Sequence, residues 1–255
     1  MKILILIIYS KSQDYYDKML EIQRKYVHNY ENVDVYFAQS SFEYNDPVVL
    51  VNDMFYVRGI EEYNTILYKS LSVMEALKNV YKKEYDFTIR SNISTLINIP
   101  KMIEYLSLYQ EKEYIYDGII CGVNRLNRPI RFALGIAIIL SKQLVNKMIN
   151  EKEKFNHKLE DDVAFGLFVE ENISSAYENN LLLSPFVFYT NSLENGYNTI
   201  LNDVINFLNK NKDENKLKYI CYRNSLANRN EDAKIMDYIC NTIILPFTSD
   251  ITGIE

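Results

Sequence analysis

The chain is poor in glycine and histidine, and it has no tryptophan. Its seven glycines form neither a GxGxxG nor a GxxxxGKS/T motif, so nothing supports a dinucleotide-binding fingerprint or a P-loop. No GxSxG segment is present, which disfavours a serine hydrolase of that type. Two histidines are too few for a three-histidine zinc site.

Cysteine and long apolar runs are also scarce. Cys121, Cys221 and Cys240 are far apart and form no CxxC pair, which favours a reducing compartment. The apolar run at residues 3–8 (ILILII) is much shorter than the roughly 20 residues that span a bilayer, and no signal-peptide cleavage site follows it. We therefore expect a cytoplasmic protein without a transmembrane segment, in the host cytoplasm if the chain is viral.

The composition is otherwise that of a globular protein. Apolar residues make up 48% and charged residues 24%, which excludes intrinsic disorder and a coiled-coil rod. The net charge is −6, so the basic excess typical of nucleic-acid-binding domains is missing and we expect no nucleic acid as a partner. The length of 255 residues fits one large domain or two small ones, and no clear boundary divides the chain.

Predicted strands and helices alternate along most of the chain. Residues 3–8 are typical of a buried parallel strand, being short, rich in isoleucine and without alternation. Residues 33–38 and 85–89 are further predicted strands, and residues 64–81 have the apolar spacing of an amphipathic helix. This order predicts an α/β fold with a largely parallel sheet flanked by helices.

Three polar clusters stand where such a fold binds ligands, at the carboxyl ends of strands or the start of a helix. Tyr9 and Ser10 follow the first strand, and residues 90–92 (RSN) follow the strand at residues 85–89. Residues 160–162 (EDD) open a predicted helix. Asp161 and Asp162 could act as a helix cap worth about 1 kcal/mol, or as a general base; spacing alone favours the cap, and one residue can do both.

Four blocks of the sequence resemble the β-1,3-galactosyltransferase and Fringe family of glycosyltransferases. Residues 62–71 (EYNTILYKSL) are similar to the family's YNNLTLKTL block, and residues 85–89 stand where the family has a strand ending in DDD. Residues 134–142 (LGIAIILSK) resemble SGxGYVLSx, and residues 161–166 (DDVAFG) resemble EDVYVG. The order and spacing of the blocks carry the resemblance, rather than any one of them.

The small soluble viral and bacterial members of this family carry RTNxS after the strand, much as residues 90–94 (RSNIS) stand here. The resemblance implies a single GT-A domain that is Rossmann-like. About residues 1–100 would form its nucleotide-binding half, and about residues 101–255 its acceptor-binding half and C-terminal segment. It further implies an inverting transfer from a UDP-sugar, or another nucleotide sugar, to a hydroxyl of a glycan or protein acceptor.

The resemblance also implies roles for individual residues. Asp162 matches the family's catalytic carboxylate, and Asp161 is the adjacent acid. Gly135 would let the backbone approach the donor sugar closely. Lys69 matches a lysine beside the nucleotide site. The uracil is expected to lie near the two residues that follow the first strand, Tyr9 and Ser10.

The departure from the family lies at DDD, which holds Mn²⁺ in ordinary members and is replaced here by Arg90, Ser91 and Asn92. Arg90 could bind the diphosphate itself, since a guanidinium binds phosphate oxygens bidentately. Alternatively, Asn92 with water could hold Mn²⁺ or Mg²⁺ weakly. In the third alternative activity is lost, and the chain is a glycosyltransferase-like module that binds carbohydrate or nucleotide. Near the C-terminus, Arg223 belongs to a basic patch that is either a solvated loop or a segment closing over the diphosphate.

Overall fold

The computed structural model describes five stretches of the chain: residues 1–28, 30–109, 113–173, 187–210 and 219–246. The chain divides into two compact units, each assembled from three separate segments. Unit 1 consists of Met1–Ser10, Glu31–Asn92 and Tyr109–Leu182, and unit 2 consists of Lys11–Tyr30, Ile93–Leu108 and Leu183–Glu255. The functional roles expected for the two halves of the chain stay predictions.

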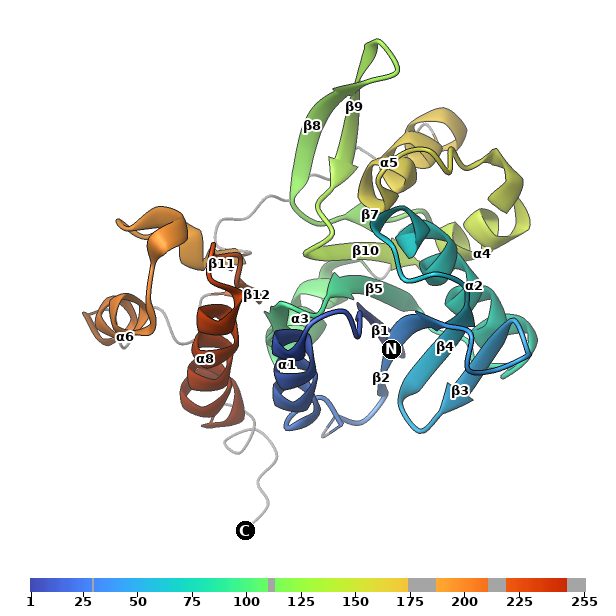
Figure 1. Ribbon diagram of the computed structural model, residues 1–255. Coiled ribbons are helices and arrows are strands. Elements are labelled where there is room, and N and C mark those ends of the chain that lie inside the picture. Colours follow the sequence, from blue (N-terminus) through green and yellow to red (C-terminus); the bar gives the residue numbers. More distant parts are fainter. Residues whose placement is uncertain (29, 110–112, 174–186, 211–218, 247–255) are drawn as a thin grey trace. The chain divides into compact units, whose positions relative to one another are not determined.

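Unit 1 is built on a seven-stranded sheet with the order β3-β4-β2-β1-β5-β10-β7 (Figure 1). The strands are β1 (Ile3–Ile8), β2 (Val33–Ser41), β3 (Val48–Val51), β4 (Met54–Arg58), β5 (Phe87–Asn92), β7 (Tyr116–Asp117) and β10 (Ala137–Ser141). β4, β2, β1 and β5 run parallel, whereas β3 and β10 are antiparallel to their neighbours. The prediction of an α/β fold with a largely parallel sheet is confirmed.

The central strand β1 is buried along its whole length, as its continuous Ile/Leu run predicts. Three helices of unit 1, α2 (Ile66–Asn79), α4 (Lys142–Asn150) and α5 (Asp161–Asn172), contribute to one hydrophobic cluster with the sheet (Figure 1). Leu6 of β1 shares this cluster with Leu71 of α2 and Leu144 of α4. The face of the sheet that carries Leu6 is therefore covered by helices.

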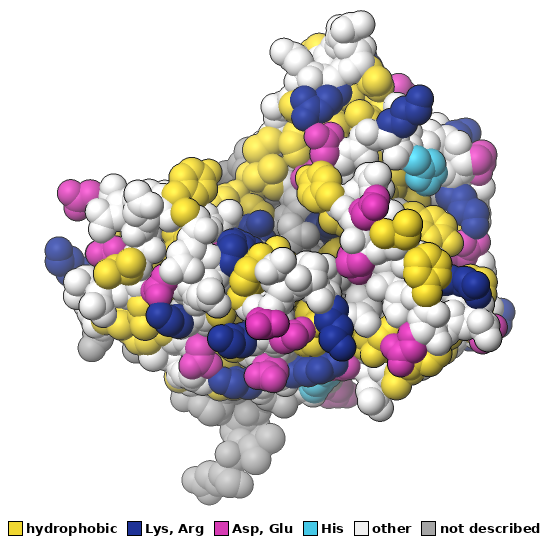
Figure 2. Space-filling view, viewed as in Figure 1, with side chains coloured by type: hydrophobic (Ala, Val, Ile, Leu, Met, Phe, Trp, Pro, Cys, Tyr) yellow, Lys and Arg dark blue, Asp and Glu magenta, His cyan; other side chains and the backbone are white. Residues whose placement is uncertain are grey.

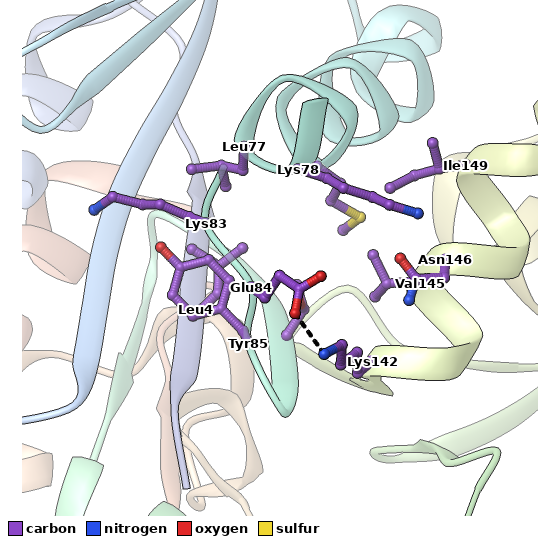
Figure 3. A pocket seen from close by; sticks show the side chains of 12 residues that line it. Leu4, Leu77, Lys78, Lys83, Glu84, Tyr85, Lys142, Val145, Asn146 and Ile149 are labelled. Carbon is purple, nitrogen blue, oxygen red and sulfur yellow. Dashed lines mark hydrogen bonds and ion pairs between the residues drawn. The ribbon is translucent and has the colours of Figure 1, made fainter. Parts of the chain in front are cut away.

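A small cavity of about 30 Å³ lies where α2 and α4 meet the amino end of β5 (Figure 3). Leu77, Tyr85 and Ile149 line it, and Lys142 forms an ion pair with Glu84 at 2.6 Å beside it. This volume holds a water molecule or two but no substrate.

The hairpin of β8 (Ile120–Arg125) and β9 (Arg128–Ala133) belongs to the same unit. Its two-residue turn has positive φ at Leu126 (53°) and Asn127 (59°), as a type I′ turn requires. α5 packs directly on β9, because a Cβ at Gly166 would lie 2.2 Å from the carbonyl oxygen of Arg131. The middle of α5 thus lies directly against β9.

Unit 2 contains the helices α1 (Asp14–Arg24), α3 (Ile99–Leu106), α6 (Leu201–Lys210) and α8 (Arg229–Ile239). Its three-stranded sheet has the order β11 (Val187–Tyr189), β12 (Cys221–Arg223) and β6 (Thr95–Ile97). Gln23 of α1 donates to the carbonyl oxygens of Ile93 and Thr95 at 3.1 and 2.6 Å, which joins α1 to β6. Among the described residues, no helix qualifies as a membrane span.

One element differs from the prediction in a way that matters for the site. The strand expected to end at residue 89 is β5, which continues through Asn92. Arg90 lies opposite Leu6 of β1 and Ile138 of β10, so it is an interior strand residue rather than the start of a loop. The apolar residues 181–189 (LLLSPFVFY) also favour a strand; they fall partly outside the described residues, which show only the end of this segment, as β11.

Candidate functional site

Arg90 is buried in unit 1, where three neighbouring groups engage it. Its Nη2 lies 2.6 Å from Oδ2 of Asp161, and the two side chains are only 1% and 6% exposed. Its Nη1 donates to the carbonyl oxygen of Gly135 at 2.9 Å and to Oδ1 of Asn92 at 2.8 Å. The buried Nε has no hydrogen-bond partner among the described residues. A carboxylate, a carbonyl and an amide oxygen thus fix the guanidinium.

Gly135 lies directly beside the guanidinium of Arg90, so a side chain at this position would require the guanidinium to shift. A Cβ at this position would lie 2.6 Å from Nη1 of Arg90 and 3.2 Å from Nδ2 of Asn92. The groups that lie this close to Gly135 are side chains of the protein itself. A contact between Gly135 and a donor sugar stays a prediction.

Asp162 and Arg90 both form hydrogen bonds to the backbone of Gly135. Oδ2 of Asp162 accepts from the Gly135 N–H at 3.3 Å, and its Oδ1 accepts from the Val163 N–H at 2.9 Å. Burial, and after it the nearby Asp161 carboxylate, raises the pKa of Asp162, while Arg90 opposes that rise. Asp162 is therefore a half-buried carboxylate with increased proton affinity, as suits a general base.

The interpretation of Asp161 and Asp162 as a helix cap is wrong in detail. The N-cap residue of α5 is Glu160, which makes no capping hydrogen bond through its side chain, and the two aspartates form the first turn. Carboxylates in a first turn are still stabilised by the helix dipole. Because successive helical residues point in different directions, Asp161 meets Arg90 while Asp162 bonds to the backbone of Gly135.

Lys69 lies inside the protein at the ends of β1 and β2. Its side chain is fully buried, and its Nζ donates to the Tyr9 carbonyl oxygen at 3.2 Å and to Oε1 of Glu61 at 2.5 Å. Burial lowers the pKa of Lys69, and Glu61 counters this effect. Oε2 of Glu61 also accepts from the Ser40 N–H at 2.6 Å. Glu61 therefore joins Lys69 of α2 to β2, while Lys69 itself reaches the end of β1, and the sequence gave no sign of this role of Glu61.

The side chains of Ser91 and Arg90 lie on opposite faces of the sheet, because successive side chains of a strand alternate between its two faces. Oγ of Ser91 donates to the carbonyl oxygen of Ile136 at 2.5 Å. Tyr9 is buried directly after β1, and Ser10 beside it is half-buried. Binding of a nucleotide sugar by these three residues stays a prediction.

Two further residues lie near the acidic residues at the start of α5, and sequence reasoning did not select them as site residues. Tyr63, in the 3₁₀ turn Tyr63–Thr65, is 69% exposed, and partial burial together with the carboxylates of Asp162 and Asp161 raises its pKa. Arg125 of β8 forms an ion pair with Glu160 at 2.8 Å. The only sign of Tyr63 in the sequence was its place in residues 62–71, the first of the four blocks that resemble the glycosyltransferase family.

Arg223 belongs to unit 2, at the end of β12. Its Nη1 donates to Oγ of Ser94, and burial, followed by the charge of Arg229, lowers the pKa of Arg223 to about 10. Arg229 in turn forms an ion pair with Asp232. Arg223 is a strand residue rather than part of a solvated loop, and its contact with a diphosphate stays a prediction.

Comparisons with known proteins give only remote likenesses. No family model matches the sequence, and no curated protein matches it. Among solved structures, a glycosyltransferase involved in the glycosylation of the major capsid of PBCV-1 is 11% identical, with a TM-score of 0.48 over 93% of this chain and 100% of that one. The glycosyltransferase GlyE of Streptococcus pneumoniae TIGR4 is 10% identical, with a TM-score of 0.43 over 98% of this chain and 64% of that one.

The galactosyltransferase LgtC, solved with donor and acceptor sugar analogs, is 9% identical, with a TM-score of 0.46 over 94% of this chain and 96% of that one. With TM-scores below 0.5, these likenesses carry no weight for the fold or the function of this chain.

The residues around Arg90 do not fit a divalent cation. Oδ1 of Asn92, the expected ligand atom, accepts a hydrogen bond from the Arg90 guanidinium, so a metal ion there would lie beside a fixed positive charge. The adjacent carboxylate of Asp161 already pairs with Arg90. Within the described stretches of chain, no group of three or more His, Cys, Asp or Glu side chains could hold a metal ion.

Proposed function

We propose that this chain is a glycosyltransferase that moves a sugar from a nucleotide sugar, with a UDP-sugar as the expected donor, to a hydroxyl of a glycan or protein acceptor. One observation carries the proposal: the half-buried Asp162, whose pKa is raised, lies at the carboxyl end of β5, where open α/β sheets bind their ligands. The four blocks that resemble the β-1,3-galactosyltransferase and Fringe family support the same conclusion.

In the proposed reaction Asp162 acts as the general base. It takes the proton from the acceptor hydroxyl while the hydroxyl oxygen forms a bond to the anomeric carbon of the donor sugar. The bond from that carbon to the nucleoside diphosphate breaks, and its electron pair leaves with the diphosphate oxygen. A single displacement of this kind inverts the anomeric carbon. The raised pKa makes Asp162 a stronger proton acceptor than an ordinary aspartate.

Positive side chains of the protein would counter the charge that develops on the diphosphate. Arg90 and Lys69 are the candidates in unit 1. Because Arg90 is paired with Asp161 and Lys69 with Glu61, these two act through space rather than by a free bidentate contact. Arg90 also holds the carbonyl of Gly135, whose N–H contacts Asp162, which makes it a positioning residue for the base.

A second candidate function is a binding module that has lost activity. The observation in its favour is that the residue at the family's metal-binding position, Arg90, is 1% exposed and directs its donors inward. Such a site could keep its fold and its affinity for a carbohydrate or nucleotide without stabilising a leaving group.

The two candidates are separated by measuring turnover and binding on the same protein. The chain is incubated with a panel of nucleotide sugars, release of nucleoside diphosphate is followed, and UDP is titrated calorimetrically with and without Mn²⁺. Release from at least one donor supports the transferase. Binding of UDP without release from any donor supports the binding module. If the chain neither binds UDP nor releases nucleoside diphosphate from any donor, the result contradicts a nucleotide-sugar enzyme. Only a carbohydrate-binding function would then remain.

A further inference from the structure

Unit 1 has a second, larger hollow that shares no lining residue with the site around Asp162. Its volume is about 960 Å³, at the upper end of the range for small-molecule sites. It lies between the edge strand β3, the outer face of α2, and the 3₁₀ turn Lys152–Lys154 with the following His157. Figure 2 shows hydrophobic side chains interspersed with charged ones over α2 and β3. We call this hollow the α2 groove.

The α2 groove has an apolar floor and an exposed aromatic ring. Leu71 and Ala76 of α2 form part of the floor, and Val49 of β3 lines the facing side. Tyr68 is 47% exposed and presents an amphipathic ring to the groove. From Tyr68 to Asn79 the helix rises about 17 Å, which gives room for a ligand of several rings.

Three of the polar side chains that line the α2 groove are carboxylates, which only accept hydrogen bonds. Glu75 is neutralised by Lys152, whose Nζ lies 2.8 and 2.6 Å from its two carboxylate oxygens. Asp46 and Glu153 add two further carboxylates, and Asn79 adds an amide. Carboxylates accept hydrogen bonds from hydroxyls and repel anions, so the lining favours a neutral, hydroxyl-rich ligand.

The edge of β3 is less suited to an added peptide strand. Leu50 of β3 donates its N–H to the hydroxyl of Tyr81 at 3.0 Å, so this backbone donor is already used. Strand addition depends on free main-chain groups of this kind. The lining therefore favours a ligand held by side chains over a peptide held by the backbone.

We propose that the α2 groove binds a neutral oligosaccharide. The ring of Tyr68 lies against the face of one sugar, and the carboxylates and the Asn79 amide accept hydrogen bonds from its hydroxyls. Such a site holds the glycan chain of an acceptor at a second point, away from the reacting hydroxyl. The choice of ligand class rests on the proposed transferase function; the existence of the site rests on the lining of the groove.

The test is an array of neutral oligosaccharides probed with the intact wild-type protein and with Tyr68→Ala. We expect wild type to bind a subset of the oligosaccharides and Tyr68→Ala to bind them about tenfold more weakly. The matched control is Tyr197→Ala, which removes a tyrosine that is 63% exposed in unit 2 and leaves binding unchanged. Asn79→Ala, at an exposed position of the groove, serves as a second variant if Tyr68→Ala unfolds.

The proposal is overturned if wild type binds no oligosaccharide on the array. It is also overturned if both groove variants, folded as judged by thermal unfolding, bind as wild type does. Donor turnover is measured separately with nucleotide sugar alone, where Tyr68→Ala should match wild type. Glycan binding that depends on Tyr68, without any donor turnover, would support the glycan site and contradict the transferase function. Donor turnover without glycan binding would support the transferase function and contradict the glycan site.

Discussion

Replacing Arg90 by methionine tests whether the buried ion pair organises the candidate site. The substitution keeps an apolar stem but removes the guanidinium, and it leaves Asp161, only 6% exposed, without its counter-ion. Removing one partner of a buried pair costs about 3–5 kcal/mol, because the remaining charge stays buried and uncompensated. The carbonyl of Gly135 also loses its donor. We expect Arg90→Met to lower the free energy of unfolding by about this amount.

Two controls show whether burial sets this cost. Arg128→Met removes a guanidinium that pairs with Glu170 and Glu171 but is 36% exposed, so it should cost only about 0–1 kcal/mol. The double variant Arg90→Met/Asp161→Asn removes the stranded charge as well, and it should recover part of the stability that Arg90→Met loses.

The assay is equilibrium unfolding in urea at neutral pH, with the slope compared between variants so that a change of midpoint reports stability. The reasoning is refuted if Arg90→Met is no less stable than Arg128→Met, since the ion pair would then behave as a surface contact.

Four further predictions concern the same site. Gly135→Ala should cost about 1–3 kcal/mol in thermal unfolding because its Cβ would lie 2.6 Å from Arg90, whereas Gly122→Ala, whose Cβ would meet only a carbonyl oxygen at 3.9 Å, should cost less. The base must be ionised to act, so kcat/KM should fall toward low pH with a midpoint above the ordinary aspartate value of about 3.9; a midpoint at or below that value would contradict the raised pKa of Asp162. The pKa of Asp162 is raised in the folded state, so protonation of Asp162 favours the native state, and stability is lost as the pH rises through the folded-state pKa. Tm measured over a series of pH values should show this loss in wild type but not in Asp162→Asn. Chelation with EDTA should slow turnover only slightly, and complete loss of activity would contradict a reaction that relies on the protein's own charges.

Much of unit 1 could be predicted from local sequence. The continuous Ile/Leu sequence of β1 predicts a buried strand. The apolar spacing of α2 predicts which of its faces packs on the sheet. The polar residues after β1 and at the start of α5 stand at the expected ends of their elements. These features depend on residues close together in the chain, which is why pattern and propensity reveal them.

The details that depend on distant partners could not be predicted. An arginine after an apolar run is typical of a strand end, because a lone buried guanidinium is too costly. Arg90 can stay inside the sheet because Asp161, Gly135 and Asn92 engage its two Nη atoms, and the first two are far along the chain. The contact of Glu61 with Lys69 and Ser40 likewise has no local pattern that would reveal it.

The most direct test of the central claim, that Asp162 is the base of a sugar transfer, is turnover by Asp162→Asn with a donor that wild type uses. The account predicts that release of nucleoside diphosphate falls by about 10²–10⁴-fold while calorimetric affinity for the nucleotide changes little. Turnover equal to that of wild type would contradict it.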